Sequence, residues 1–169
     1  NAVSTHVNLM TFVKKARKKG ARLVVIDPYL NRTAKISDQH VNPRPGTNGA
    51  LATAMMGTIL NEGLADGEWL QARSDFDTAM AAHLKGCTPE WAAAITGLDA
   101  SAIRAVALEY GRARAPFIKI GLGMTRQRNG AVNLHAVSCL PAMTGAWDKK
   151  GGGALFATGD AFKIDKSPV

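Results

Sequence analysis

Apolar residues recur along most of this chain with a helical period, and a few short apolar runs interrupt that pattern. The spacing of Val7, Met10 and Val13 predicts a first helix, which Ser4 or Thr5 can cap. The following β-branched run, residues 22–26, predicts a strand. A helix followed directly by a strand is the beginning of an α/β pattern.

A second predicted strand, residues 116–120, resembles the first in how it ends. The first runs into Asp27 and Pro28, and the second runs into Gly121 and Gly123. A short third strand is predicted at 41–43, before a Pro/Gly turn. Open α/β sheets bind ligands at the carboxyl ends of their strands, so these ends are the first places to look for a site.

Several further helices separate the two strands, and one helix follows the second strand. Trp69 and Trp91 lie in this helical part, and we expect both to anchor the core. The chain then closes with a glycine loop at 151–153 and a polar tail. The predicted helices cover residues 49–60, 66–73, 76–84, 88–97, 101–112 and 131–143.

The order of elements predicts one Rossmann-like α/β domain over residues 1–169, with three layers and few parallel strands. Two or three strands are few for a parallel sheet that needs cover on both faces. A helix at residue 4 with no strand before it indicates that the first strand of a β-α-β unit precedes Asn1. We expect the beginning of the chain to be cut, so the sequence does not predict a cellular compartment.

Composition and charge argue against some classes of protein. The chain has 169 residues, of which 46% are hydrophobic, and carries a net charge of +8. No apolar run approaches the roughly 18 residues of a membrane span. The charge allows a nucleic-acid binder, but aromatic residues make up only 6% of the chain, which is few for stacking against bases. Five of the cations crowd the end of the first helix, where solvation is the favoured interpretation: Lys14, Lys15, Arg17, Lys18 and Lys19.

Two thiols, Cys87 and Cys139, are too few for a disulfide framework and lack the spacing of a zinc or iron–sulfur site. We expect both to be buried. The four histidines are far apart in sequence, so no nucleophile and base can be paired and no catalytic residue is predicted. They are His6, His40, His83 and His135.

Three segments are candidates for binding a nucleotide-like ligand. Asp27 can accept paired hydrogen bonds from a ribose or a guanine, or it can cap the turn that Pro28 begins, and the two interpretations are about equally supported. Residues 45–49 can present backbone amides at a helix start, although an ordinary Thr or Asn cap is the commoner explanation. Gly121 and Gly123 permit close backbone approach but lack the spacing of a dinucleotide fingerprint.

The ordered set of these segments resembles the molybdopterin oxidoreductase family, the bis-molybdopterin guanine dinucleotide enzymes of the dimethyl sulfoxide reductase type. The resemblance extends over nearly the whole chain, and the set is far more specific than any single motif. It rests on residues 20–28, 33–38, 44–51, 88–97, 121–123, 140–145 and 151–153.

In that family such a segment holds one guanine dinucleotide of the cofactor. The resemblance implies that Asp27 contacts the guanosine end, that residues 46–48 line the base pocket, and that 123–126 lie nearer the pterin. Asn48 stands where many members have Asp, and Tyr29 stands where Arg is common, so the guanine contact differs in chemistry from theirs. The implied cofactor-binding residues are Asn1, Asp27, Pro28, Tyr29, Gly46, Thr47, Asn48, Gly123, Met124, Thr125 and Arg126.

The resemblance also implies what lies elsewhere in the parent enzyme. The cofactor is the molybdenum or tungsten form of the bis-guanine dinucleotide, and any iron–sulfur cluster and the protein ligand of the metal lie outside this segment. We expect the partners to be the remaining domains of the same catalytic subunit and an electron-transfer subunit, with no nucleic acid and no membrane contact. Two alternatives stay open: a nucleotide-binding regulatory or interaction module without redox activity, and a basic nucleic-acid-binding domain.

Overall fold

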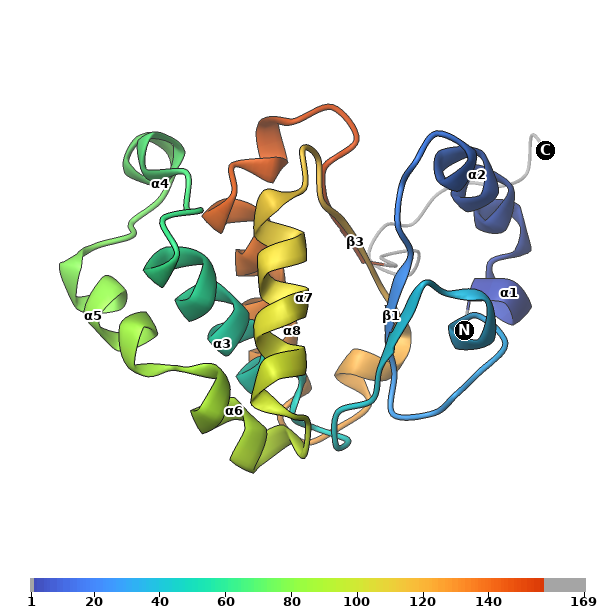
Figure 1. The fold of residues 1–169 in the computed structure, drawn as a ribbon, viewed down its shortest axis with the longest axis horizontal. Helices are drawn as coiled ribbons and strands as arrows, with labels where there is room; N and C mark the ends of the chain where they lie inside the picture. Colours follow the sequence, from blue (N-terminus) through green and yellow to red (C-terminus); the bar gives the residue numbers. More distant parts are fainter. Residues whose placement is uncertain (1, 157–169) are drawn as a thin grey trace, which may run out of the picture.

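The computed structural model describes residues 2–156, and the predicted site residue Asn1 lies outside this range. Helices dominate, and the strands are short and parallel (Figure 1). The helices are α1 (Ala2–Thr5), α2 (Val7–Lys18), α3 (Asn48–Asn61), α4 (Gly67–Arg73), α5 (Thr78–Gly86), α6 (Pro89–Thr96), α7 (Ala100–Arg112) and α8 (Gly130–Met143). The strands are β1 (Val24–Ile26), β2 (Gln39–Val41), β3 (Phe117–Ile120) and β4 (Gly153–Phe156), and the 3-10 turns are η1 (Ala34–Ile36), η2 (Leu122–Thr125) and η3 (Ala146–Asp148).

The strands form two separate parallel pairs, β1 with β2 and β3 with β4. Val24 faces Gln39 in the first pair, and Phe117 faces Gly153 in the second. The connection from β3 to β4 passes through α8, which makes a β-α-β unit, whereas only η1 lies between β1 and β2. In Figure 1 the strands β1 and β3 lie between α2 on one side and α3, α7 and α8 on the other. The predicted α/β class with few parallel strands is therefore confirmed.

Helix α3 forms the centre of the core. Most of its side chains are buried, and it packs against α5, α6, α7 and α8. A Cβ added to Gly57 would lie 2.7 Å from the Cys87 carbonyl oxygen and even closer to that of Leu84. The missing side chain at Gly57 therefore lets the end of α5 approach the α3 backbone. Ile59 and Ile103, both fully buried, belong to the same apolar cluster.

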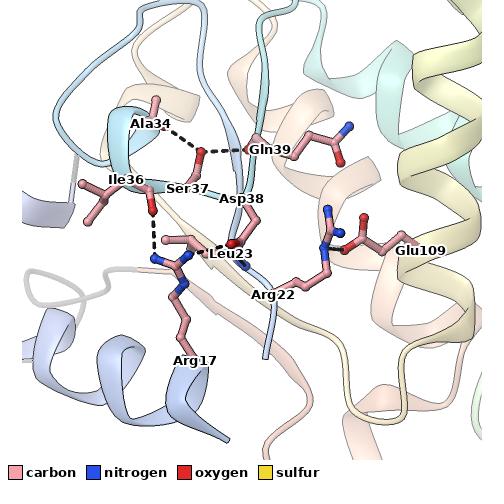
Figure 2. A network of polar contacts seen from close by, with 9 residues as sticks. All are labelled: Arg17, Arg22, Leu23, Ala34, Ile36, Ser37, Asp38, Gln39 and Glu109. Atoms are coloured by element: carbon pink, nitrogen blue, oxygen red, sulfur yellow. Dashed lines mark hydrogen bonds and ion pairs between the residues drawn. The ribbon is translucent and has the colours of Figure 1, made fainter. Parts of the chain in front are cut away.

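A polar network joins α2 to the first pair of strands (Figure 2). The Arg17 guanidinium donates to the Ile36 carbonyl over 2.8 Å and to Oδ1 of Asp38 over 2.6 Å. The other oxygen of Asp38 accepts the Leu23 amide at 2.7 Å, which fixes the segment before β1. These bonds, led by that of the Leu23 amide, hold the pKa of the Asp38 carboxyl below its ordinary value of 3.8.

A second ion pair ties this region to the helical block. Arg22 Nε lies 2.7 Å from Oε1 of Glu109 on α7, as Figure 2 also shows. Arg17 and Arg22 are thus both used inside the fold, Arg17 with Asp38 and Arg22 with Glu109. Both pairs are partly exposed, so we expect each to contribute little to stability by itself.

The helix boundaries follow capping chemistry where the caps form. Thr88 accepts the Trp91 amide at 3.3 Å and Pro89 opens α6, while Gly97 ends it in the left-handed region at φ 73°, as predicted. The predicted cap at Ser4 or Thr5 is wrong, because α1 takes up residues 2–5 and α2 begins after His6. Asp99 precedes α7, but its side chain makes no capping hydrogen bond.

Other predictions fail where tertiary contacts decide. The glycine loop at 151–153 leads into the strand β4, whose pairing with β3 sequence periodicity could not show. The third strand lies at Gln39–Val41, two residues earlier than predicted. Trp91 is 41% exposed, since it lies on the outer side of α6 and does not anchor the core. Ile26 is 42% exposed, so β1 is only partly buried.

Within residues 2–156, no single helix has both the length and the apolar character needed to cross a membrane. Helices α6 and α7 meet that test only when taken together, and they are bent by 118° at the break between them.

Candidate functional site

The three predicted binding segments follow the carboxyl ends of three strands. Asp27 follows β1. Residues 46–48 lie at the end of the loop after β2 and at the start of α3, and residues 123–126 lie after β3, within and just after η2. Strands β1 and β2 are parallel and run beside each other, so their ends point the same way. Figure 1 shows β3 ending toward the same side, the lower one in that view. The structure thus brings the segments to one side of the fold.

The carboxylate of Asp27 is engaged by its own turn. Oδ1 accepts the Tyr29 amide at 2.8 Å, and Oδ2 accepts the Asn31 side-chain amide at 2.8 Å. The Asp27 backbone amide continues the pairing with β2 by donating to the Val41 carbonyl at 3.0 Å. The turn-capping interpretation of Asp27 is therefore realised in the structure. It leaves acceptor capacity, because each carboxylate oxygen can accept more than one hydrogen bond.

Asn31 stabilises this turn from its buried side. Its side chain is 4% exposed, and its Oδ1 accepts the amides of Thr33 at 2.8 Å and Ala34 at 3.0 Å. Pro28 and Tyr29, by contrast, are exposed, with Tyr29 at 73%. The Tyr29 side chain is therefore exposed to solvent, on a turn whose backbone is held by hydrogen bonds.

The second segment enters α3 through a left-handed glycine. Gly46 has φ +85°, a conformation that favours glycine, and Thr47 is the N-cap residue. The Thr47 hydroxyl does not cap α3, because it donates back to the Arg44 carbonyl at 2.7 Å. Asn48 is already the first helical residue and is half-buried. An ordinary side-chain cap therefore does not explain why Thr and Asn stand here.

The third segment is open around its glycines. A Cβ added at Gly121 or Gly123 would have no atom within 4 Å, and neither residue has a positive φ. The fold itself therefore does not require glycine at either position. Met124 packs against the core, while Thr125 and Arg126 are exposed.

Two asparagines that sequence reasoning missed connect the second segment to the start of α8, which follows the third segment in the chain. Asn129 Nδ2 donates to the Gly46 carbonyl at 2.8 Å, and Asn133 Nδ2 donates to the same oxygen at 3.1 Å. Oδ1 of Asn133 accepts the Gly49 amide at 2.8 Å. An amide-bearing residue four positions after another at the start of an apolar helix is the only sequence signal that could have pointed to them.

The thiols offer no metal centre in the described part of the chain. Cys87 is buried, as predicted, whereas Cys139 is only half-buried. Burial raises the pKa of both thiols, and the Asp75 carboxylate raises that of Cys139 further. Each sulfur lies near the histidine four residues before it, but residues 2–156 contain no group of three or more His, Cys, Asp or Glu placed to hold a metal.

Comparison with known proteins decides the family. The model of the molybdopterin oxidoreductase family matches residues 1–163. The chain belongs to this family. That result confirms the family predicted from the ordered motifs, and it covers all three candidate segments.

Two relatives from bacteria match most of this chain. The probable oxidoreductase YoaE of Bacillus subtilis is 39% identical over 155 residues, covering 92% of this chain and 23% of the relative. Formate dehydrogenase H of Escherichia coli is 32% identical over 145 residues, covering 86% of this chain and 20% of the relative. The chain thus spans less than a quarter of the length of either protein.

A solved structure shares the fold. Acetylene hydratase from Pelobacter acetylenicus superposes with a TM-score of 0.78 at 26% sequence identity, covering 86% of this chain and 20% of that one. The fold match and the family match therefore agree over the part of the molecule that contains the candidate site.

Proposed function

We propose that this chain holds one guanine dinucleotide arm of the cofactor in a molybdenum- or tungsten-dependent oxidoreductase. The proposal rests on the convergence of three predicted binding segments at the carboxyl ends of parallel strands, in a chain of the molybdopterin oxidoreductase family. In α/β folds, ligands bind beyond the carboxyl ends of the strands. The relatives named as formate dehydrogenases act on formate, and the substrate of this protein is a separate question.

The residues present fit such a group. Gly121 and Gly123 leave open space where any side chain would stand, as a loop does when a ligand lies against its backbone. Asp27 and Asn48 supply acceptor oxygens of the kind that guanine donors and ribose hydroxyls need. Arg126 is exposed in the third segment and adds positive charge suited to an anionic cofactor.

In this proposal each segment has its own task. Asp27, on the turn fixed by Asn31, accepts hydrogen bonds from the guanosine end, and Tyr29 lies beside it. Gly46, Thr47 and Asn48 line the base pocket at the start of α3. Residues 123–126 lie nearer the pterin. The cofactor supplies two-electron redox chemistry when bound, while the protein positions it and shapes its electrostatic surroundings.

We further propose that the partners are the other domains of the same subunit and an electron-transfer subunit. The protein ligand of the metal and any iron–sulfur cluster would lie in those parts, and this segment would contact neither nucleic acid nor membrane.

A nucleotide-binding module without redox activity would use the same three segments. A nucleic-acid binder would instead use the cationic end of α2, where a shallow hollow of about 530 Å³ is lined by the Asp38 carboxylate as well as by Lys14, Arg17, Lys18 and Arg22.

Metal and nucleotide content of the full-length protein tests the proposal. Mass spectrometry of the purified protein should find molybdenum or tungsten, and acid should release about two guanine nucleotides per metal, as the family cofactor implies. Guanine without metal would favour the module without redox activity. Neither metal nor guanine, from a host that makes the cofactor, would overturn the proposal. RNA binding that weakens steeply with salt would support the nucleic-acid alternative.

A further inference from the structure

We infer that Asn133 is a positioning residue that sets the distance between the second and third binding segments, residues 46–48 and 123–126. This inference rests on the proposed function, because it concerns the same site. Asn133 is the fourth residue of α8 and is only 2% exposed. Its side chain therefore faces the protein and does not touch a ligand directly.

On one side, Asn133 holds the start of α3 at two points. Its Oδ1 accepts the Gly49 amide at 2.8 Å, and its Nδ2 donates to the Gly46 carbonyl at 3.1 Å. A side chain with a donor and an acceptor on one planar group is needed to satisfy both at once, which Asn provides and Asp, Ser or Leu does not. The two bonds enclose Thr47 and Asn48, so the backbone of these residues cannot shift independently of α8.

The approach of the two helices leaves no spare room at this point. A Cβ added to Gly49 would lie 2.5 Å from Oδ1 of Asn133 and 3.5 Å from its Cα. The position of α3 is thus set by direct contact with Asn133 as well as by hydrogen bonds. Asn129, four residues earlier, adds a third bond to the second segment by donating to the Gly46 carbonyl at 2.8 Å. Its Oδ1 also accepts Asn133 Nδ2 at 3.2 Å, which joins the two asparagines.

On the other side, the same end of α8 holds the third segment. A Cβ on Gly130 would lie 2.7 Å from the Thr125 Cα and 2.9 Å from the Met124 carbonyl oxygen. The Gln127 side chain also donates to that oxygen at 3.2 Å. The stretch from Gln127 to Asn133 therefore touches both segments, and we call it the α8 bracket.

If the α8 bracket holds both segments, weakening the hydrogen bonds of Asn133 should loosen both of them. This includes residues 123–126, which Asn133 does not contact. In the full-length protein, Asn133→Asp keeps the size of the side chain but turns an oxygen toward the Gly46 carbonyl and Asn129 Oδ1. We expect faster amide hydrogen exchange over 46–49 and 123–126 in the cofactor-free protein. We also expect the amount of guanine retained per protein after gel filtration to fall by at least about tenfold. The reason is that a carboxylate oxygen would repel the Gly46 carbonyl oxygen, to which the Asn133 amide donates.

Two further variants keep the test decisive if Asn133→Asp folds poorly. Asn129 is exposed, so Asn129→Ala should fold and give a smaller loss of the same kind. Thr58→Val is the matched control, because it removes one buried hydrogen bond, from Thr58 Oγ1 to the Ala54 carbonyl, in α3 but away from the bracket. It should change neither exchange over the two segments nor guanine retention.

A double-mutant cycle gives a readout that general destabilisation would not produce. Gly49→Ala alone should reduce guanine retention strongly, because its Cβ would collide with Oδ1 of Asn133. Asn133→Ala removes that oxygen, so the effects of the two substitutions on guanine retention should be far from additive. Additive losses would overturn direct positioning by Asn133. Unchanged exchange in Asn133→Asp would overturn the bracket, and faster exchange with guanine fully retained would overturn its role in cofactor binding. A wild-type protein without guanine would overturn the proposed function and this role with it.

Discussion

The side-chain amide of Asn31 donates a 2.8 Å hydrogen bond to Oδ2 of Asp27, so a buried residue fixes the carboxylate of the first binding segment. Replacing Asp27 would therefore remove the proposed ligand contact and also loosen the turn. We expect Asp27→Ala in the full-length protein to lower molybdenum or tungsten occupancy by about tenfold, the effect of losing a charge-assisted contact. Metal analysis against the wild type checks this.

A second substitution separates the two effects at this turn. Asn31→Ala breaks the bond to Asp27 and the bonds to the Thr33 and Ala34 amides, but it keeps the carboxylate. Occupancy should fall less than in Asp27→Ala. Equal losses in the two variants would show that Asp27 acts only by holding the turn.

Replacing a glycine by alanine should have different effects at two positions, one in the third segment and one just after it. Gly123→Ala places a Cβ in open space, so the fold should keep its stability while cofactor retention falls. Gly130→Ala places a Cβ against the Thr125 and Met124 backbone, so it should lower the free energy of unfolding by about 1–3 kcal/mol, as overpacking does. Urea unfolding and acid-released guanine measure the two effects. A Gly123→Ala protein that binds cofactor as tightly as the wild type would mean that no ligand lies against that loop.

The hydrogen bonds to Asp38 predict a pH dependence. The Leu23 amide, together with Arg17, holds its pKa below 3.8 in the folded protein, so the contribution of the carboxylate to stability is present above that value. It is lost as the pH falls through the folded pKa. Compared at the same pH, the Leu23 amide should exchange hydrogen faster in Asp38→Asn than in the wild type near pH 6, and the difference should shrink as the pH falls through the lowered pKa of Asp38. The exposed carboxylate of Asp75 supplies the control, since Asp75→Asn should leave that amide unaffected at every pH.

Close packing of α3 and α5 predicts a cost at Gly57. A Cβ there meets the Cys87 and Leu84 carbonyls, which belong to the backbone and cannot move aside as a flexible side chain can. Gly57→Ala should lower the free energy of unfolding by about 1–3 kcal/mol. Gly67→Ala, at the start of α4 with open space around it, should be neutral or slightly stabilising. Similar urea midpoints for the two variants would argue against this packing.

The sequence predicted most of the helices and the positions of the candidate segments after the strands, because those features depend on local chemistry. The α6 cap at Thr88 and the end of that helix at Gly97 follow from single residues. The placement of Asp27 after β1 and of Gly121 and Gly123 after β3 follows from short apolar runs. Such signals need no knowledge of distant contacts.

What the sequence could not show depends on contacts between distant residues. Strand β4 forms because Gly153 reaches Phe117, and a glycine-rich stretch gives no local sign of a strand. Asn133 lies 84 positions from Gly49, and nothing near it in sequence shows that its amide would be buried against α3. The role of Asn31 in fixing Asp27 was missed for a different reason: its hydrogen bonds are local, but an asparagine in a polar segment gives no sign in the sequence that it is buried.

Hydrogen exchange of the full-length protein with and without its cofactor tests most directly whether this chain holds the guanine dinucleotide. Loaded protein should show slower exchange over 27–31, 46–49 and 121–126 together, while α5, which lies outside the candidate site, should exchange alike in both states. Equal exchange over the three segments in loaded and cofactor-free protein would contradict the proposal, because a bound dinucleotide would then have to lie elsewhere.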